Sequence, residues 1–578
     1  LPHPKTISRW YQVINGRPSF TQEAFSAIKA KAQNSTVICN LVIDEMAIHS
    51  GIHWNGNKWY GFVDMGTDFN YDNDNISQAK NALVFLAVTL NEYWKVPLGY
   101  FLIADLNGKD RCYLLTKRLE LFNETGAHLN SLTFDGAYVN KTMCTKLNAS
   151  FKYESLTSSI TNVINKEPIF LFLDPCHMVK LVRNTFGDKQ VFKNNEGKYI
   201  KWFFIEKLFE KQYTEGLRAG TKLTKIHLNY RNEKMNVRLE VQILSESVSK
   251  ALIYCKEIDQ PNFGEASATA EFCMMINQAF DILNSRNQFN KSPFNISINL
   301  NTINKYEEFS KRFKNYIGGL TFCNGQKIVD LNRNTGFVGL ILSLESAINL
   351  FNQDHLENYF SAMRSMFGFN NNPNYATIIL PLDNGTDLIT DTDVTQDISS
   401  EMDISQQTDY DYIKTLWKLN RYIEDVSAYI GGFVVRKLLK TINCSVCSSC
   451  IQNSDTDNYL INIKNRGSLI KPSKDVELLS KETEKCIRQH QEIVFKQKNI
   501  VQFSKNKVKR ALYEVVFKNE EMYQLIICQQ QFNNHRDQLI NLIITFYLNI
   551  RLHHEGKQFD KESRLRNKFT KLVLFNNE

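Results

Sequence analysis

The chain has 578 residues, of which 43% are hydrophobic and 12% aromatic. A chain of this length is too long for one hydrophobic core, so we expect roughly three or four domains. No apolar run is long enough to cross a membrane, so we expect a soluble protein without a membrane partner. The chain begins with Leu1 and shows no signal segment, which suggests a trimmed fragment that has lost its N-terminal localisation signals.

The net charge of +8 understates how basic most of the chain is. Residues 383–413 contain nine acidic side chains and no Lys or Arg, and this Ser/Thr/Gln-rich stretch predicts a disordered acidic loop. The more basic remainder suits a polyanionic partner such as nucleic acid, and the basic segment 496–510 is expected to contact phosphates. Charge by itself does not establish nucleic-acid binding, because many basic proteins bind none.

The first elements expected along the chain are two short helices. Pro4 precedes the first, which carries Ile7, Trp10 and Ile14 on one side, and the second covers residues 21–33. Two short helices joined by a tight turn fit a helix-turn-helix fragment and fit a plain helical hairpin equally well. On the pattern alone we favour the plain hairpin slightly.

From Ser35 the hydrophobic periodicity predicts strands, and later strands that alternate with helices. Strands are expected at residues 35–48, 57–66, 81–91, 94–105, 131–135 and 166–174. Helices are expected at residues 111–126, 136–149 and 175–186. This order predicts an α/β fold with a mixed sheet covered by helices.

Acidic residues follow two of the apolar strands. Asp44 and Asp135 both close such strands, which is where open α/β sheets build their sites. Asp135 precedes Gly136 and could instead be a turn residue, whereas no turn signal follows Asp44. Asp174 precedes Pro175 and has the residue type of a helix N-cap with proline at the first helical position. Asp44 is therefore the hardest of these acids to explain as a cap.

A third acid lies on the predicted helix over residues 352–368. Glu357 and Asp354 follow a stripe beside the apolar face of this helix. If Asp44, Asp135 and Glu357 converge, their repulsion is tolerable only with cations between them. Oxygen ligands select Mg²⁺ or Mn²⁺, and two such ions can drive phosphoryl transfer on nucleic acid. A scaffold that uses the acids only as caps is the alternative, and it predicts scattered carboxylates.

Most cysteines lie singly in apolar segments, which is typical of reduced thiols in an intracellular protein. Cys444, Cys447 and Cys450 are the exception, because two CxxC spacings overlap there. These thiolates could hold zinc if Cys486 or His490 supplied a fourth ligand. A cysteine cluster without metal explains the spacing equally well.

Seven blocks of sequence, in the same order, resemble the transposases of the P-element superfamily, including their THAP-domain relatives. The blocks are IDEMAI, FDGAYVN, LDPCHMVKLVRNTFGDK, KMNVRLEVQILSESVSKAL, TAEFCMMINQAFDILNSRN, NQDHLENYFSAMRSMFGFNNNPN and SAYIGGFVVRKL. The resemblance implies an RNase H-like core with a DDE triad and carries that triad onto Asp44, Asp135 and Glu357. The choice of Glu357 over Glu345 depends on this resemblance. Lys180, Arg183 and Asn184 are candidate phosphate contacts, with a solvated helix face as the alternative.

The long gap before Glu357 matches what the family has as a GTP-binding insertion, here about Lys193 to Leu344 and mainly helical. By similarity the nucleotide contacts are Lys222, Val237, Asp281 and Asp354. The sequence contains no Walker-type loop, and Asn236 stands where a lysine is expected.

The resemblance implies a cut-and-paste DNA transposase in the nucleus, with two Mg²⁺ ions (or Mn²⁺) and GTP as an assembly cofactor. Its partner is double-stranded DNA at transposon ends and target sites, bound by a homodimer or higher oligomer. The family's zinc-coordinating THAP module is expected to be missing, and a domesticated DNA-binding protein without transposition activity is the alternative. The expected divisions are a helix-turn-helix remnant (1–34), the first part of the core (35–192), the insertion (193–344), the closing catalytic helix (345–382), the acidic loop (383–413) and a basic helical C-terminal domain (414–578).

Overall fold

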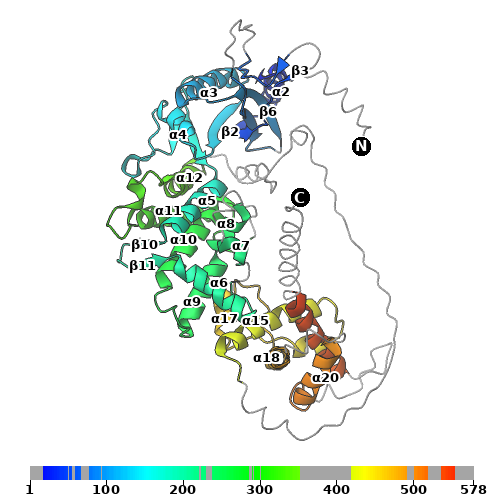
Figure 1. Cartoon of the computed structure of the whole chain (residues 1–578). Helices are drawn as coiled ribbons and strands as arrows, with labels where there is room; N and C mark the ends of the chain where they lie inside the picture. Colours follow the sequence, from blue (N-terminus) through cyan, green and yellow to red (C-terminus); the bar gives the residue numbers. More distant parts are fainter. Residues whose placement is uncertain are drawn as a thin grey trace, which may run out of the picture. The chain divides into compact units, whose positions relative to one another are not determined.

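The computed structural model describes residues 17–49, 51–54, 59–66, 77–92, 94–220, 223–228, 237–285, 290, 292–299, 301–351, 418–490, 500–518 and 535–553. The chain divides into two compact units (Figure 1). We call residues 1–214, 218–368 and 463–468 the core unit, and residues 215–217, 369–462 and 469–578 the C-terminal unit.

The core unit contains a mixed sheet of seven strands in the order β1-β6-β5-β2-β7-β9-β8. β2 pairs antiparallel with β5 and parallel with β7, and β7 pairs parallel with β9, while the remaining neighbours are antiparallel. The strands are β1 (Ser19–Phe20), β2 (Ile38–Ala47), β5 (Asn81–Thr89), β6 (Lys95–Ile103), β7 (His128–Phe134), β8 (Ser159–Thr161) and β9 (Pro168–Leu173). The predicted mixed sheet is confirmed.

The predicted strand over 57–66 does not form as one continuous strand, although Asp64 makes an isolated antiparallel bridge with Leu102 of β6. Within it only β4 (Trp59–Tyr60) is a strand, and it pairs with β3 (His53–Trp54) in a separate hairpin. The short edge strand β1 was not predicted, because a strand of two residues shows no periodicity.

The central strand β2 is buried along most of its length. Residues 38–43 are all buried, as a continuous apolar run between two covered faces requires. The one polar side chain in that run is Asn40, whose Oδ1 accepts hydrogen bonds from Ser131 Oγ at 2.9 Å and Thr133 Oγ1 at 3.1 Å. The polar group is therefore satisfied inside the sheet.

Helices form at the positions that the sequence predicts, and α2 and α3 pack against strands of the sheet. The predicted helices 21–33, 111–126, 136–149 and 175–186 are confirmed as α2 (Gln22–Ala32), α3 (Gly108–Asn123), α4 (Tyr138–Thr145) and α5 (Pro175–Lys189). The partner helix expected near the N-terminus lies outside the described residues, so the choice between a helix-turn-helix fragment and a hairpin stays open.

The helix α12 (Thr335–Phe351) packs against α5 and β9 and runs antiparallel to β9. Ser343 Oγ donates to the carbonyl of Leu173 at 3.0 Å, and Ser346 Oγ donates to the carbonyl of Leu171 at 2.6 Å. The beginning of α12 therefore lies near the carboxyl end of β9, and its later turns lead away from that end.

The segment between α5 and α12 is mainly helical, as predicted. Its described residues form a small hairpin, α-helices and a short 3-10 helix: β10 (Val191–Lys193), β11 (Tyr199–Lys201), α6 (Phe203–Glu215), α7 (Lys225–Leu228), α8 (Val237–Ile243), α9 (Glu246–Glu257), α10 (Ser267–Leu283), α11 (Ile303–Gly318) and η2 (Ile328–Asp330). An aromatic cluster joins this segment to α5. The centroid of the Phe186 ring lies 5.2 Å from the ring centroid of Phe192, 5.3 Å from that of Trp202 and 5.2 Å from that of Phe272. The insertion thus shares a packed core with α5.

The described part of the C-terminal unit is helical. Its elements are α15 (Arg421–Leu438), α16 (Ser445–Cys450), α17 (Tyr459–Lys464, whose last two residues are counted in the core unit), α18 (Lys474–Gln489), α20 (Ile500–Leu512) and a helix over residues 535–553. Aliphatic side chains from α15, α18, α20 and the last helix form one buried core. The acidic stretch 383–413 lies outside the described residues.

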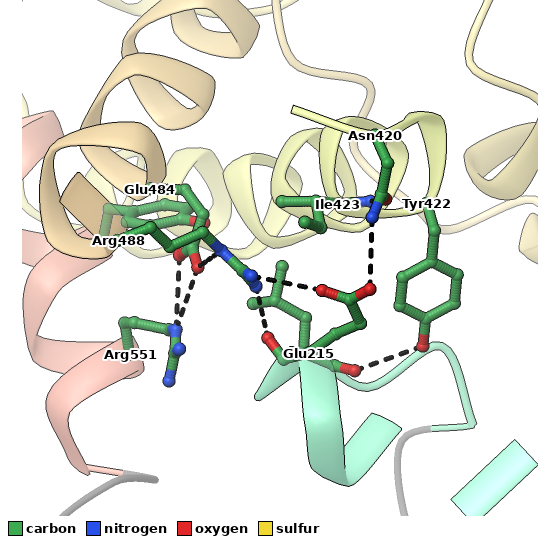
Figure 2. Close-up of polar contacts among 9 residues, drawn as sticks. Glu215, Asn420, Tyr422, Ile423, Glu484, Arg488 and Arg551 are labelled. Carbon is green, nitrogen blue, oxygen red and sulfur yellow. Dashed lines mark hydrogen bonds and ion pairs between the residues drawn. The ribbon is translucent and has the colours of Figure 1, made fainter. Parts of the chain in front are cut away.

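A fully buried carboxylate lies inside this helical unit (Figure 2). Glu484 on α18 accepts a hydrogen bond from Arg488 Nε at 2.9 Å and from Tyr547 OH at 3.1 Å. Arg551 Nε lies 3.2 Å from Glu484 Oε2. Arg488 also pairs with Glu215 Oε2 at 3.1 Å, so the buried charges form a network.

Among the described helices, none is both long enough and apolar enough to span a membrane.

Candidate active site

Asp44 and Asp135 lie at neighbouring positions of two adjacent parallel strands. Ile43 of β2 is paired with Phe134 of β7, and each aspartate is the next residue of its chain. Neighbouring strands are about 4.8 Å apart, so the two aspartates start from adjacent backbone positions. Asp44 does not end its strand as predicted, because β2 continues to Ala47 in its pairing with β5. It lies where the parallel pairing with β7 stops.

The two aspartates are close enough to interact electrostatically. Although the Asp44 side chain reaches solvent, surrounding atoms crowd its carboxylate, and this burial raises its pKa to about 6. The charge of Asp135 raises the pKa of Asp44 further. A bound cation would relieve the repulsion that Asp135 exerts on the Asp44 carboxylate.

Asp174 lies in line with the same two residues. Phe134 of β7 is paired with Leu173 of β9, and Asp174 follows directly. Its Oδ1 accepts a hydrogen bond from the Cys176 backbone N–H at 2.9 Å, so the predicted N-cap with proline at the helix start is confirmed. Burial raises the pKa of Asp174 to about 6, and the charge of Asp44 adds to the rise. Asp174 is therefore both a cap and an electrostatic neighbour of the candidate site.

A chain of buried polar groups fixes Asp135. Its Oδ1 accepts hydrogen bonds from the Ala137 backbone N–H at 3.0 Å and from Asn140 Nδ2 at 2.6 Å. Arg111 Nη1 donates to Asn140 Oδ1 at 2.7 Å, and the same guanidinium forms an ion pair with Glu45. Sequence reasoning missed these residues: Asn140 had the signal of closely following Asp135, whereas Arg111 reads as an ordinary helix arginine. They hold the carboxylate in one orientation.

The start of α5 brings further charged groups to this end of the sheet. Burial and the charge of Lys180 lower the pKa of His177 to about 4, while the charge of Asp135 opposes that change. Lys180 Nζ lies 3.3 Å from His177 Nδ1. Lys180 and Arg183 are both buried, so the predicted solvated face is wrong for these two, and neither is placed as a surface phosphate contact.

Glu357 lies outside the described residues, but the structure describes its alternative, Glu345. Lys141 Nζ donates to Thr335 Oγ1 at 2.7 Å, which places the start of α12 beside the helix that follows Asp135. Glu345 lies about 15 Å farther along α12. There its Oε1 pairs with Lys314 Nζ of α11 at 2.7 Å. The described partner of Glu345 is therefore a lysine of the insertion.

Of the four predicted nucleotide contacts, only the Asp281 side chain is described. Val237 begins α8, and Lys222 and Asp354 lie outside the described residues. Asp281 Oδ2 accepts a hydrogen bond from Asn277 Nδ2 at 2.8 Å. Burial raises the pKa of Asp281 to about 6, although the Asn277 hydrogen bond and the charge of Arg466 lower it.

Asp281 belongs to a polar cluster in the insertion. Asn277 Oδ1 accepts a hydrogen bond from the Glu246 backbone N–H at 3.0 Å. The Glu246 carboxylate pairs with Lys250 Nζ at 2.6 Å and also with Arg466, which the chain brings back from the segment 463–468. The cluster combines anionic and cationic groups beside one helix pair, α9 and α10.

The described part of the basic segment 496–510 is α20, and some of its cations already have partners within the protein. Lys507 contacts His490 Nε2, and Lys509 Nζ pairs with Asp537 at 2.6 Å. Arg510 is exposed. The expected phosphate contacts of this segment stay a prediction.

Comparison with known proteins gives matches along most of the chain. The sequence matches models of the TNP-like RNase H N-terminal domain (residues 16–148), the TNP-like GTP-binding insertion domain (176–296), the TNP-like RNase H C-terminal domain (349–377) and the C-terminal domain of DNA transposase THAP9 (418–557).

Two relatives and one solved structure align with the chain. The DNA transposase THAP9 of Homo sapiens is 22% identical over 92% of this chain and 63% of its own length, so the chain spans less than two thirds of that relative. The Transposable element P transposase of Drosophila melanogaster is 22% identical over 99% of this chain and 74% of its own length. The structure of the Drosophila P element transposase strand transfer complex has a TM-score of 0.50 at 18% identity, covering 64% of this chain and 79% of that one.

These matches confirm the predicted RNase H-like fold with its helical C-terminal part. Most of the segment between α5 and α12 falls within the match to the TNP-like GTP-binding insertion domain. The ordered domain matches, the two relatives and the shared fold show that the chain belongs to the P-element superfamily of transposases.

Proposed function

We propose that this chain is a DDE-type DNA transposase that cuts DNA at transposon ends and joins the ends to target DNA. The single observation that carries the proposal is the placement of Asp44 and Asp135 at matching positions of adjacent parallel strands. The proposal includes a homodimer or higher oligomer on DNA, action in the nucleus, and the domain limits expected from the sequence. The family matches support the reaction class.

The candidate site fits divalent metal ions. Asp44 and Asp135 offer carboxylate oxygens, and burial together with the charge of Asp135 raises the pKa of Asp44 to about 6. Oxygen ligands of this kind suit Mg²⁺ or Mn²⁺. When bound, two such ions would activate the attacking water or 3′-hydroxyl and stabilise the leaving oxygen of a phosphodiester.

The protein's own part in this chemistry is to hold the ligands still. Asn140 and the Ala137 N–H keep one oxygen of Asp135 occupied, so the other is left to point into the site. Arg111 holds Asn140 in turn.

A strand-transfer assay on labelled transposon-end DNA tests the proposal. We expect Asp44→Asn, Asp135→Asn and Glu357→Gln each to abolish cleavage with DNA binding nearly intact, because each removes metal-binding charge but little packing. Glu345→Gln is the matched control and should keep cleavage activity. Near-normal turnover in any triad variant would refute the assignment, and a wild-type chain that binds DNA without cutting it would identify a domesticated DNA-binding protein.

We further propose that the insertion binds a guanine nucleotide as an assembly cofactor, with Lys222, Val237, Asp281 and Asp354 as contacts. The match to a GTP-binding insertion model and the polar cluster around Asp281 support this. Asp281→Ala and Asp354→Ala should weaken GTP binding in calorimetry and GTP-dependent end pairing in gel shifts. Wild-type GTP affinity in both variants would contradict the proposal.

A further inference from the structure

The C-terminal unit brings together three metal-binding side chains that the proposed reaction does not use. The ligand atoms of Cys444, Cys447 and His535 all lie within 4.8 Å of one another. Cys447 Sγ lies 3.5 Å from His535 Nδ1. Cys447 is buried, and the other two side chains are half-buried. This is a compact group of soft and borderline ligands at the edge of a hydrophobic core.

The spacing within this group suits a tetrahedral zinc ion. Zinc binds thiolate sulfur at about 2.3 Å and imidazole nitrogen at about 2.0–2.1 Å, so a sulfur and a nitrogen at two corners of the tetrahedron lie about 3.6 Å apart. The observed 3.5 Å between Cys447 Sγ and His535 Nδ1 matches that edge. Thiolate and imidazole ligands together favour zinc over Mg²⁺ or Ca²⁺.

The group differs from the one that the sequence suggested. His490 Nδ1 lies 3.0 Å from the Cys486 carbonyl, and its Nε2 contacts Lys507, so both ring nitrogens already have neighbours. The side chain that lies beside the two cysteines is His535, 88 residues after Cys447, and not Cys486 or His490. Neither Cys486 nor His490 belongs to the described group.

The position of the group indicates a structural role. Cys444 is the N-cap residue of α16, where no side chain caps the helix, and α16 has only six residues. A helix this short is not stable without tertiary contacts. A metal ion held by Cys444, Cys447 and the first residue of the helix over 535–553 would fasten α16 to that helix.

We propose that Cys444, Cys447 and His535 bind a zinc ion that fixes α16 to the helix over 535–553. The ion takes three corners of its tetrahedron from these side chains, and a water molecule or a further side chain takes the fourth. Binding requires both thiols as thiolates, so it releases their protons. The site is separate from the aspartate pair and does not depend on the proposed reaction.

The test uses the full chain, purified under reducing conditions without chelator, with zinc measured by mass spectrometry. We expect stoichiometric zinc in the wild type, and loss of that zinc in Cys447→Ser and His535→Ala. Cys450→Ser is the matched control, since Cys450 lies on the same helix outside the group, and it should keep its zinc. Cobalt added to the zinc-free wild type should give the absorption of thiolate-bound tetrahedral Co²⁺.

A second measurement separates metal binding from folding. After removal of zinc from the wild type, hydrogen exchange should accelerate in α16 and at the start of the helix over 535–553, while α15 keeps its protection. Several outcomes would overturn the proposal: a wild type without zinc that shows no cobalt–thiolate absorption, zinc retained in Cys447→Ser, or a Cys444–Cys447 disulfide in the protein purified under reducing conditions.

Discussion

The buried carboxylate of Glu484 offers a direct test of what stabilises the C-terminal unit (Figure 2). The change Glu484→Gln keeps the size of the side chain and removes its charge. Arg488 and Arg551 then lose the anion to which their Nε atoms now bond, at 2.9 and 3.2 Å. Breaking a buried ion pair by removing one partner costs about 3–5 kcal/mol. We expect the C-terminal unit to lose that much free energy of unfolding.

Hydrogen exchange of the full chain, followed by mass spectrometry, measures this loss locally. Since about 1.4 kcal/mol corresponds to a factor of ten, peptides from α18 and from residues 535–553 should lose protection by about a hundred- to several-thousand-fold. Glu482→Gln on the same helix is the control, because Glu482 lies 3.9 Å from Lys485 in a more exposed pair worth about 0–1 kcal/mol. Equal effects of the two substitutions would refute the reasoning.

Two further predictions concern the core unit. Arg118 is fully buried, and none of its three guanidinium nitrogens has a hydrogen-bond partner in the described part of the chain. Burial lowers the pKa of Arg118 to about 8. The guanidinium lies 4.0 Å from the centre of the Phe20 ring, so a cation–π contact partly offsets the cost of its burial. Arg118→Met should therefore raise the free energy of unfolding by about 1–3 kcal/mol in thermal and denaturant unfolding, and a decrease would show that ring stacking outweighs desolvation. The folded pKa of Asp44, about 6, lies above its ordinary value of 3.8, so without metal the folded state holds this proton more tightly than the unfolded state. In EDTA, the free energy of unfolding should then fall as the pH rises from 3.8 to about 6, and it should fall less steeply in Asp44→Asn. The same pH dependence in that variant as in the wild type would contradict the raised pKa.

Local sequence determined the elements that carry the candidate site. The apolar runs ending near Asp44, Asp135 and Asp174 predicted β2, β7 and β9, because residues buried on both faces of a sheet have to be apolar along the whole strand. Asp174 and Pro175 predicted the start of α5, since capping depends only on neighbouring backbone groups. The two-residue strand β1 was beyond this reasoning, because it is too short to show a period. The strand expected over 57–66 formed only in part, as β4 of a separate hairpin with β3.

Tertiary structure decided which distant groups meet. The support of Asp135 by Asn140 and Arg111 depends on how α3 packs against α4, and helical periodicity shows which face of a helix is apolar but not which buried arginine finds a partner. Lys180 likewise was a candidate phosphate contact, with a solvated helix face as the alternative, and its side chain is buried. The choice of His535 over His490 beside Cys447 comes from contacts across 88 residues, a separation at which local sequence patterns carry no information about distance.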